Sequence, residues 1–198
     1  MATAAAQPVA LTRSEKEARN VAALHEMLVG FNSRNAQRML AVFNEDMEWL
    51  DVPMEHSYRG HQEVDEFLAK LFIAFPDVTY ELHEVVAEDD MLSAKFTMHG
   101  THLGHFYGIP PTGRRVDLPC LSQIEMRDGK FVYDHCYFDT GMCLRQMGLM
   151  PPLSVTDTAM GRATFWLMVE RAKVARMLGG ALATALLFIG IRKVRNKD

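Results

Sequence analysis

Three histidines stand three residues apart in the stretch from His99 to His105, HGTHLGH, and this spacing would suit a metal site on a helix. Gly100 and Gly104 interrupt a helical pattern and a Pro-Pro pair follows, so we expect the extended end of a strand instead. On a strand, residues three apart point to opposite faces, which separates His102 from the other two. We therefore expect no metal site here.

The cysteines are the next candidates for chemistry. Cys120, Cys136 and Cys143 form no CxxC pair, and their number is odd. This pattern argues against a disulfide framework and against a zinc site. Free thiols are typical of a reducing compartment, so we expect the main domain in the cytosol or in a reducing organelle.

The elements that must position such residues begin with helices. Ser14 and Glu17 have the spacing of a capping box, and apolar residues then recur at helical spacing as far as Phe31. A second helical stretch covers residues 35–43, a short strand 47–52 and a third, amphipathic helix 60–75. The period then changes to two, which predicts strands over 78–87, 91–103, 116–126 and 130–138. Helices followed by strands predict an α+β domain, with N-terminal helices packed on a curved antiparallel sheet.

A two-residue turn at Asp128-Gly129 would set the pairing of the last two strands. Opposite pairs are then Leu118 and Asp139, Cys120 and Tyr137, Ser122 and His135, and Ile124 and Tyr133. The face with Leu118, Cys120 and Ile124 is apolar, so Asp139 is expected on the buried side, where the pKa of a carboxyl rises. The same pairing puts Cys120 and Cys136 on opposite faces, which argues against a disulfide between them.

The charge is divided along the chain. Residues 1–158 carry 13 Lys and Arg against 23 Asp and Glu, whereas residues 159–198 carry 8 against 2. Phosphate contacts need clustered basic residues, so the acidic part argues against nucleic acid as a partner. We expect a disordered leader over 1–14, a folded domain over 15–150, a linker over 151–162 and a C-terminal apolar helix over 163–198. An Ala-rich start with few acidic residues also leaves a short transit peptide open.

The C-terminal helix contains an uncharged stretch, residues 177–191, whose 15 residues would span about 22 Å. Extension back to Ala172 gives about 30 Å, the thickness of a bilayer core, if Lys173 and Arg176 reach the headgroups. Because this stretch is apolar on all sides, we expect residues 172–191 to anchor the protein in a membrane. The alternative is a helix docked on the protein or on a partner.

The segment GTHLGHFYGIPPTGRRV resembles the loop of the SnoaL-like polyketide cyclases, also called ester cyclases, within the nuclear transport factor 2-like superfamily. Other parts of that pattern stand in the expected order: Arg59-Gly60-His61, the Ile124, Asp128, Gly129 and Lys130 hairpin, and then Asp139, Gly141, Leu144, Gln146, Met147 and Gly148. The resemblance covers about residues 15–150. It implies a cone in which a bent sheet wraps over helices around an apolar pocket, and a homodimer formed through the outer sheet face.

The resemblance also implies an acid/base enzyme that needs no cofactor. Asp139 would remove a proton next to a carbonyl, the enolate would attack a second carbonyl, and the acid would return the proton. His102 and His135 are the candidate catalytic partners, and donors to the oxyanion would come from His102, His135, Tyr137 and Trp49. The candidate substrate-binding residues are Trp49, Phe106, Tyr137, Leu118 and Ser122.

The sequence leaves alternatives open. Asp139 could cap the turn at Thr140-Gly141, and His135 could be a core histidine. The protein is expected to be a cyclase or isomerase of the aldol or enolisation type, acting on a lipophilic polyketide-like carbonyl compound. The other possibility is a non-catalytic ligand-binding or scaffold subunit of a membrane-associated complex, because fold alone does not fix function.

Overall fold

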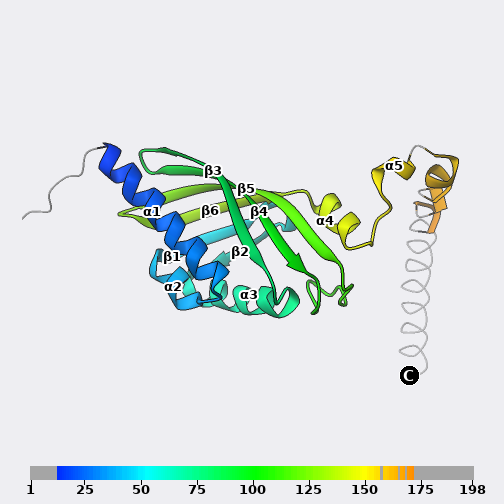
Figure 1. Cartoon of the computed structure of the whole chain (residues 1–198), viewed down its shortest axis with the longest axis horizontal. Helices are drawn as coiled ribbons and strands as arrows, with labels where there is room; N and C mark the ends of the chain where they lie inside the picture. The colour runs from blue at the N-terminus through cyan, green and yellow to red at the C-terminus, as the bar shows by residue number, and fades with distance from the viewer. Residues whose placement is uncertain (1–12, 157, 165, 168, 172–198) are drawn as a thin grey trace, which may run out of the picture. The chain divides into compact units, whose positions relative to one another are not determined.

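A computed structural model describes residues 13–156, 158–164, 166–167 and 169–171 (Figure 1). Residues 1–150 and 151–198 form two separate units. The first contains α1 (Arg13–Asn32), α2 (Ala36–Ala41), β1 (Phe43–Asp51), the 3-10 turn η1 (Val52–Met54), β2 (His56–Arg59), α3 (Gly60–Ala74), β3 (Thr79–Glu88), β4 (Met91–Thr101), β5 (Arg115–Arg127), β6 (Lys130–Phe138) and α4 (Thr140–Gln146). The described part of the second contains α5 (Leu153–Thr156) and further helical residues between 159 and 171.

The six strands form one curved sheet in the order β2-β1-β6-β5-β4-β3, which confirms the predicted α+β class (Figure 1). Neighbouring strands are antiparallel except β1 and β6, which run parallel. The sheet is therefore mixed, and the expectation of a purely antiparallel sheet was wrong. The short strand β2 was also not predicted, because its four residues are too few for a clear period.

Helices α1 and α3 supply apolar faces to the core. Leu24, Met27, Leu28 and Phe31 of α1 are buried at helical spacing, as are Val64, Phe67, Leu68 and Leu71 of α3. Along β5, buried and exposed residues alternate without a break, so one face of this strand packs in the core and the other meets solvent. This alternation gives the sheet an inner face that can line a cavity.

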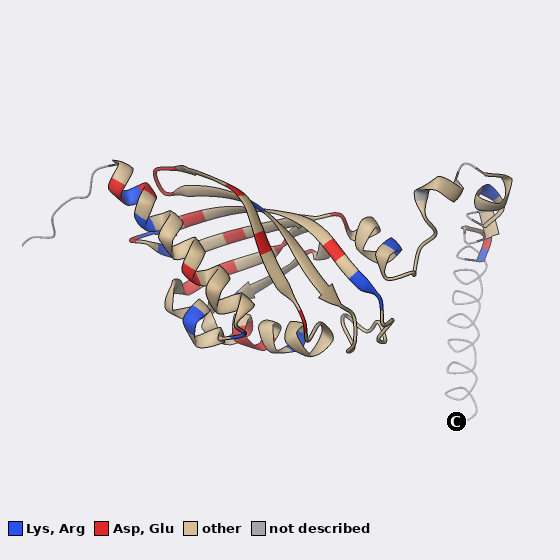
Figure 2. Ribbon diagram, in the orientation of Figure 1, with Lys and Arg blue, Asp and Glu red and all other residues tan. Residues whose placement is uncertain are grey.

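Acidic side chains are spread over the strands and helices of the first unit, and Lys and Arg are fewer there (Figure 2). The predicted anchor over residues 172–191 lies outside the described residues. Among the residues that are described, no helix has both the length and the apolar character needed to cross a bilayer.

Candidate active site

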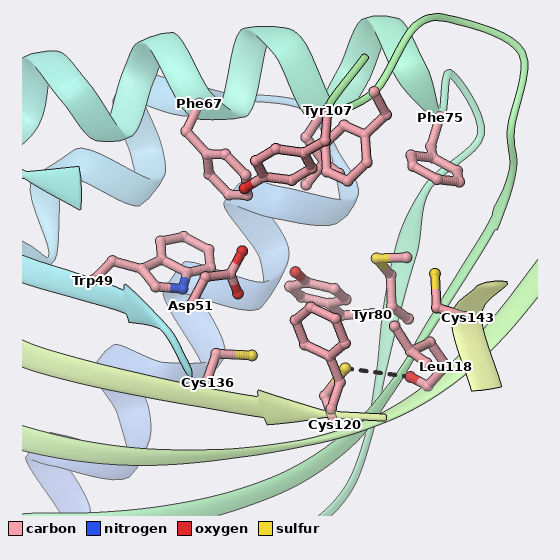
Figure 3. Close-up of a pocket in the computed structure, with 14 residues that line it drawn as sticks. Trp49, Asp51, Phe67, Phe75, Tyr80, Tyr107, Leu118, Cys120, Cys136 and Cys143 are labelled. Atoms are coloured by element: carbon pink, nitrogen blue, oxygen red, sulfur yellow. Dashed lines mark hydrogen bonds between the residues drawn. The ribbon is translucent and has the colours of Figure 1, made fainter. Parts of the chain in front are cut away.

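A cavity opens between α3, the inner face of the sheet and the loop that follows β4 (Figure 3). Most of its wall is aromatic or aliphatic. The lining residues are Trp49, Asp51, Phe67, Leu71, Phe75, Tyr80, Met98, Phe106, Tyr107, Leu118, Cys120, Cys136, Phe138 and Cys143. Among them Asp51 is the sole carboxylate, so any proton transfer by a carboxyl in this cavity falls to Asp51.

Asp51 is the last residue of β1, and the alternation of that strand directs it inward. Met47, Trp49 and Asp51 are buried, whereas the residues between them are partly exposed. The Asp51 side chain is only 6% exposed, and burial raises the pKa of its carboxyl from 3.8 to about 6. A hydrogen bond from the Tyr107 hydroxyl lowers that pKa in part, since it stabilises the charged form. Asp51 is thus placed to exchange protons close to neutral pH.

Tyr107 reaches the cavity from a tight turn in the loop after β4. Reciprocal backbone hydrogen bonds of 3.1 and 2.9 Å join Phe106 and Ile109, and the residues between them, Tyr107 and Gly108, have positive φ of 47° and 78°. The Tyr107 hydroxyl is hydrogen-bonded to the hydroxyl of Tyr58 on β2. This pair of hydroxyls joins the loop to the edge strand of the sheet beside Asp51.

Trp49 lies two residues before Asp51 on the same face of β1. Its indole ring meets Phe67 of α3 edge to face, with ring centroids 5.4 Å apart. Trp49, Phe106 and Leu118, which were predicted as substrate-binding residues, all line the cavity. Their contact with a substrate remains a prediction.

Asp134 is a second buried carboxyl, behind the cavity wall. It is 4% exposed and lies opposite Trp49 on β1 and opposite Ile124 on β5. Burial raises the pKa of Asp134 from 3.8 to about 7, the Ser122 hydroxyl lowers it by hydrogen bonding, and the nearby Asp51 charge raises it further. Ser122 therefore faces inward as expected, but it serves Asp134 and does not line the cavity.

Asp139 is not in this cavity, and its prediction as the buried acid/base was wrong in placement. Its side chain is 56% exposed. It caps α4 by accepting a hydrogen bond of 2.9 Å from the backbone N–H of Met142, and it pairs with Arg145. The Met142 hydrogen bond is the main reason that the pKa of Asp139 is lowered. Asp139 is therefore a helix-capping residue, the alternative role that its sequence position left open.

The error comes from a β-bulge in the last hairpin. Arg127 does lie opposite Lys130, but the pairing shifts at Val132, which has no partner on β5. Beyond it, Ser122 pairs with Cys136 and Cys120 with Phe138. A shift of one residue moves every later side chain to the other face. The bulge accordingly brings Asp134 and Cys136 inward and turns the alternate residues of β6 outward.

His135 and Tyr137 are two residues that this shift turns outward, which overturns their predicted roles at the pocket. Tyr137 is 41% exposed. His135 lies in a shallow hollow on the outer face with Gln123, Glu125 and Tyr133. Neither side chain can contact a ligand in the inner cavity. Dimerisation through this outer face remains a prediction.

The bulge also changes the sheet face on which Cys136 lies. Cys120 and Cys136 were expected on opposite faces, but both point inward, and they line the cavity together with Cys143 (Figure 3). All three are free thiols. Burial raises the pKa of Cys143 to about 11, so this group is a neutral thiol in the cavity wall.

The histidines of HGTHLGH divide as strand parity predicts. His99 lies on the outer face, 2.6 Å from Asp117 and 3.2 Å from Glu81, and the Asp117 hydrogen bond is the main reason that its pKa is raised. His102 is fully buried and packs on Phe75, but it is not among the cavity-lining residues. In the described part of the chain, no group of three or more His, Cys, Asp or Glu side chains is arranged to hold a metal ion.

His102 supports the loop rather than the cavity. Its Nδ1 accepts a hydrogen bond of 3.3 Å from the backbone N–H of Thr112, and burial lowers its pKa. Backbone hydrogen bonds of 2.9 Å link His102 to Arg114 and to Gly113. The predicted catalytic role of His102 is therefore not supported by its position, and its contacts hold the loop that carries Tyr107.

Sequence reasoning missed Asp51, Tyr58 and Tyr107. A signal for Asp51 was present, because the predicted strand over 47–52 places it on the same face as Trp49. Tyr107 gave no such signal, since its direction depends on the turn within the loop. The chemistry of the cavity thus rests on one inward carboxyl, two linked tyrosines and an aromatic wall.

Comparison with known proteins gives a family and a fold. The family model described as "SnoaL-like domain" matches residues 24–133. A proposed SnoaL-like polyketide cyclase from Jannaschia sp. CCS1 is 20% identical and superposes with a TM-score of 0.64, covering 72% of this chain and 100% of its own. No curated protein shows significant sequence similarity to the chain.

Two Streptomyces structures are also similar. AclR of Streptomyces galilaeus, a proposed hydroxylase, is 24% identical with a TM-score of 0.60, over 68% of this chain and 99% of its own. IdmH of Streptomyces antibioticus, a proposed polyketide cyclase, is 23% identical with a TM-score of 0.58, over 65% and 98%. At these identities the structures show that the fold is shared.

Proposed function

The chain belongs to the SnoaL-like domain family, and on this premise we propose that it is an acid/base enzyme acting on a lipophilic carbonyl compound. The observation that carries the proposal is the single carboxylate of Asp51 inside an otherwise apolar and thiol-lined cavity. An apolar wall suits a lipophilic substrate. Burial in this wall also raises the pKa of Asp51 towards the pH at which a general base is most efficient.

In the proposed reaction, an Asp51 carboxylate oxygen takes a proton from the carbon next to the substrate carbonyl. The electron pair of the broken C–H bond moves into the carbonyl and gives an enolate. The protonated Asp51 then returns the proton to carbon, which completes an enolisation or isomerisation. In a cyclase the enolate carbon would attack a second carbonyl, and Asp51 would protonate the new alkoxide.

Tyr107 would adjust this step through its hydrogen bond to Asp51. The bond stabilises the carboxylate and therefore keeps enough of it ionised at neutral pH to act as a base. The Tyr58 hydroxyl, bound to that of Tyr107, would hold Tyr107 in place. The similar structures include both a proposed hydroxylase and a proposed polyketide cyclase. We therefore propose the substrate only as a class, a lipophilic carbonyl compound.

Solvent deuterium exchange tests the proposal with a simple ketone. In deuterium oxide, wild-type protein should speed deuterium incorporation at the carbon next to the carbonyl of α-tetralone, followed by NMR. Asp51→Asn should lower that rate by about 100- to 10,000-fold, as loss of a general base does. Asp65→Asn, an exposed position on α3, is the matched control and should exchange at the wild-type rate.

If the wild-type protein binds α-tetralone but does not speed deuterium exchange, the enzyme proposal is refuted. The remaining function would then be that of a non-catalytic ligand carrier. The apolar wall is the observation that favours this second function, because a carrier needs the cavity but no base.

The predicted anchor at residues 172–191 would place either an enzyme or a carrier beside a membrane. Deletion of residues 163–198 should then release the protein into the soluble fraction, and retention on membranes would contradict the anchor.

A further inference from the structure

The indole N–H of Trp49 is a buried hydrogen-bond donor that has no partner. The Trp49 side chain is 4% exposed, and its Nε1 contacts no acceptor within the described part of the chain. Of the described residues that line the cavity, Trp49 is the one with a buried side-chain nitrogen or oxygen left unpaired. An unpaired buried donor costs about 1–3 kcal/mol, so it is rare unless something else satisfies it.

The position of this donor is specific. Trp49 and Asp51 are two residues apart on β1 and project from the same face of the strand. In Figure 3 the indole nitrogen lies on the edge of the ring that is nearer to Asp51. Packing against Phe67 holds the indole ring in this orientation. The Trp49 N–H donor and the Asp51 carboxylate base therefore project from the same face of one strand.

Several polar groups near the cavity already have partners. The Tyr58 and Tyr107 hydroxyls bind each other, and a hydrogen bond from Tyr107 lowers the pKa of Asp51. The Cys120 thiol donates to the Leu118 carbonyl at 3.3 Å. The buried Trp49 N–H differs from these groups because it has no partner in the described part of the chain.

We propose that Trp49 Nε1–H donates a hydrogen bond to the carbonyl oxygen of the substrate and holds the enolate oxygen formed when Asp51 takes the proton. The inference rests on the proposed function and makes Trp49 a catalytic residue that selects ligands with an oxygen acceptor. An indole N–H donates only, so this donor can bind a ketone oxygen but offers no hydrogen bond to an ammonium or a hydrocarbon. The hydrogen bond strengthens as negative charge develops on that oxygen, which lowers the barrier to enolate formation.

The test compares α-tetralone with tetralin, which has the same ring system without the carbonyl oxygen. The full chain has two tryptophans, Trp49 and Trp166, so indole N–H signals in a ¹⁵N–¹H spectrum are assigned with Trp49→Phe and Trp166→Phe. Trp166 is 63% exposed and serves as the matched control. Addition of α-tetralone should move the Trp49 indole proton downfield and leave that of Trp166 in place. Tetralin should cause no downfield movement.

Binding constants give the second readout. Trp49→Phe keeps an aromatic ring in the wall but removes the N–H, so it should weaken α-tetralone about 3- to 10-fold and leave tetralin unchanged. Trp166→Phe should bind both as wild type does. An unchanged preference for the ketone in Trp49→Phe, an unmoved Trp49 signal on ketone binding, or no ketone binding by wild type would each overturn the assignment.

Failure of the proposed function looks different. A downfield Trp49 signal together with an absence of deuterium exchange would retain the donor and refute the enzyme. Deuterium exchange that Asp51→Asn abolishes and Trp49→Phe does not slow would retain the enzyme and refute the donor.

Discussion

The hydroxyls of Tyr58 and Tyr107 are hydrogen-bonded to each other, so the edge strand β2 and the loop after β4 meet beside Asp51. Tyr107 is presented from a turn with positive φ, a conformation that is costly for a bulky residue and needs support from its surroundings. That support comes from the Tyr58 hydroxyl, the Phe106–Ile109 hydrogen bonds and the loop contacts of His102. The pairing connects the loop to the acid/base chemistry of the cavity.

Tyr107→Phe should raise the pKa of Asp51 above its wild-type value of about 6. The lost hydroxyl stabilises the carboxylate, and without it the protonated form is favoured. The base form would then appear at higher pH, by on the order of one unit, so the pH profile of deuterium exchange should shift upward. Tyr133→Phe, on the outer face, is the control. A downward shift, or an equal shift in both variants, would contradict the hydrogen bond.

Asp134→Asn should make stability less sensitive to pH. The pKa of Asp134 is about 7 in the folded protein against 3.8 as its ordinary value, so the folded state holds this proton more tightly. The stabilisation that protonated Asp134 gives the wild-type fold is therefore lost as the pH rises from about 4 to about 7. Between pH 5 and pH 8 this loss lowers the free energy of unfolding by about 3 kcal/mol. Relative to wild type, Asp134→Asn should gain stability at pH 8 compared with pH 5 in urea unfolding. Asp65→Asn should show no such gain, and equal behaviour of the two variants would count against the buried charge.

Deletion of Val132 should leave the fold intact. Val132 is the unpaired residue of the bulge, and a plain hairpin without it still pairs Ile124 with Asp134 and Ser122 with Cys136. Asp134 and Cys136 should therefore still point inward, and the deletion should cost about 2 kcal/mol of unfolding free energy, as Val132→Ala does, for the lost packing of a buried side chain. Urea unfolding and the dispersion of NMR spectra compare the two variants. A deletion variant that unfolds while Val132→Ala stays folded would show that the sheet needs the bulge itself.

Asp139→Ala should cost about 1 kcal/mol of unfolding free energy, because the hydrogen bond that caps α4 is lost. Asp139→Asn keeps a side-chain oxygen for the cap and should be close to wild type in stability. Both variants should keep the exchange activity of wild type, whereas Asp51→Asn loses it. Loss of activity in a stable Asp139→Asn would return the acid/base role to Asp139.

The sequence alone determined the class of the fold and three of the residues that line the cavity. Periodicity gave α1, α3 and the long strands, because the 3.6-residue and two-residue repeats are properties of the local chain. The motif around His102 identified the family, and parity placed His99 and His102 on opposite faces. Trp49, Phe106 and Leu118 were found because their positions depend only on alternation or on the motif.

Only the tertiary structure decided which carboxylate faces the cavity. The unpaired Val132 shifts β6 by one residue, and the hairpin turn that precedes it carries no sign of this shift. Asp134 and Cys136 therefore moved inward, while Asp139 became a surface cap. The parallel pairing of β1 with β6 then set Asp51 opposite Cys136 across the two strands. Register between strands depends on packing over the whole sheet, so local pattern could not supply it.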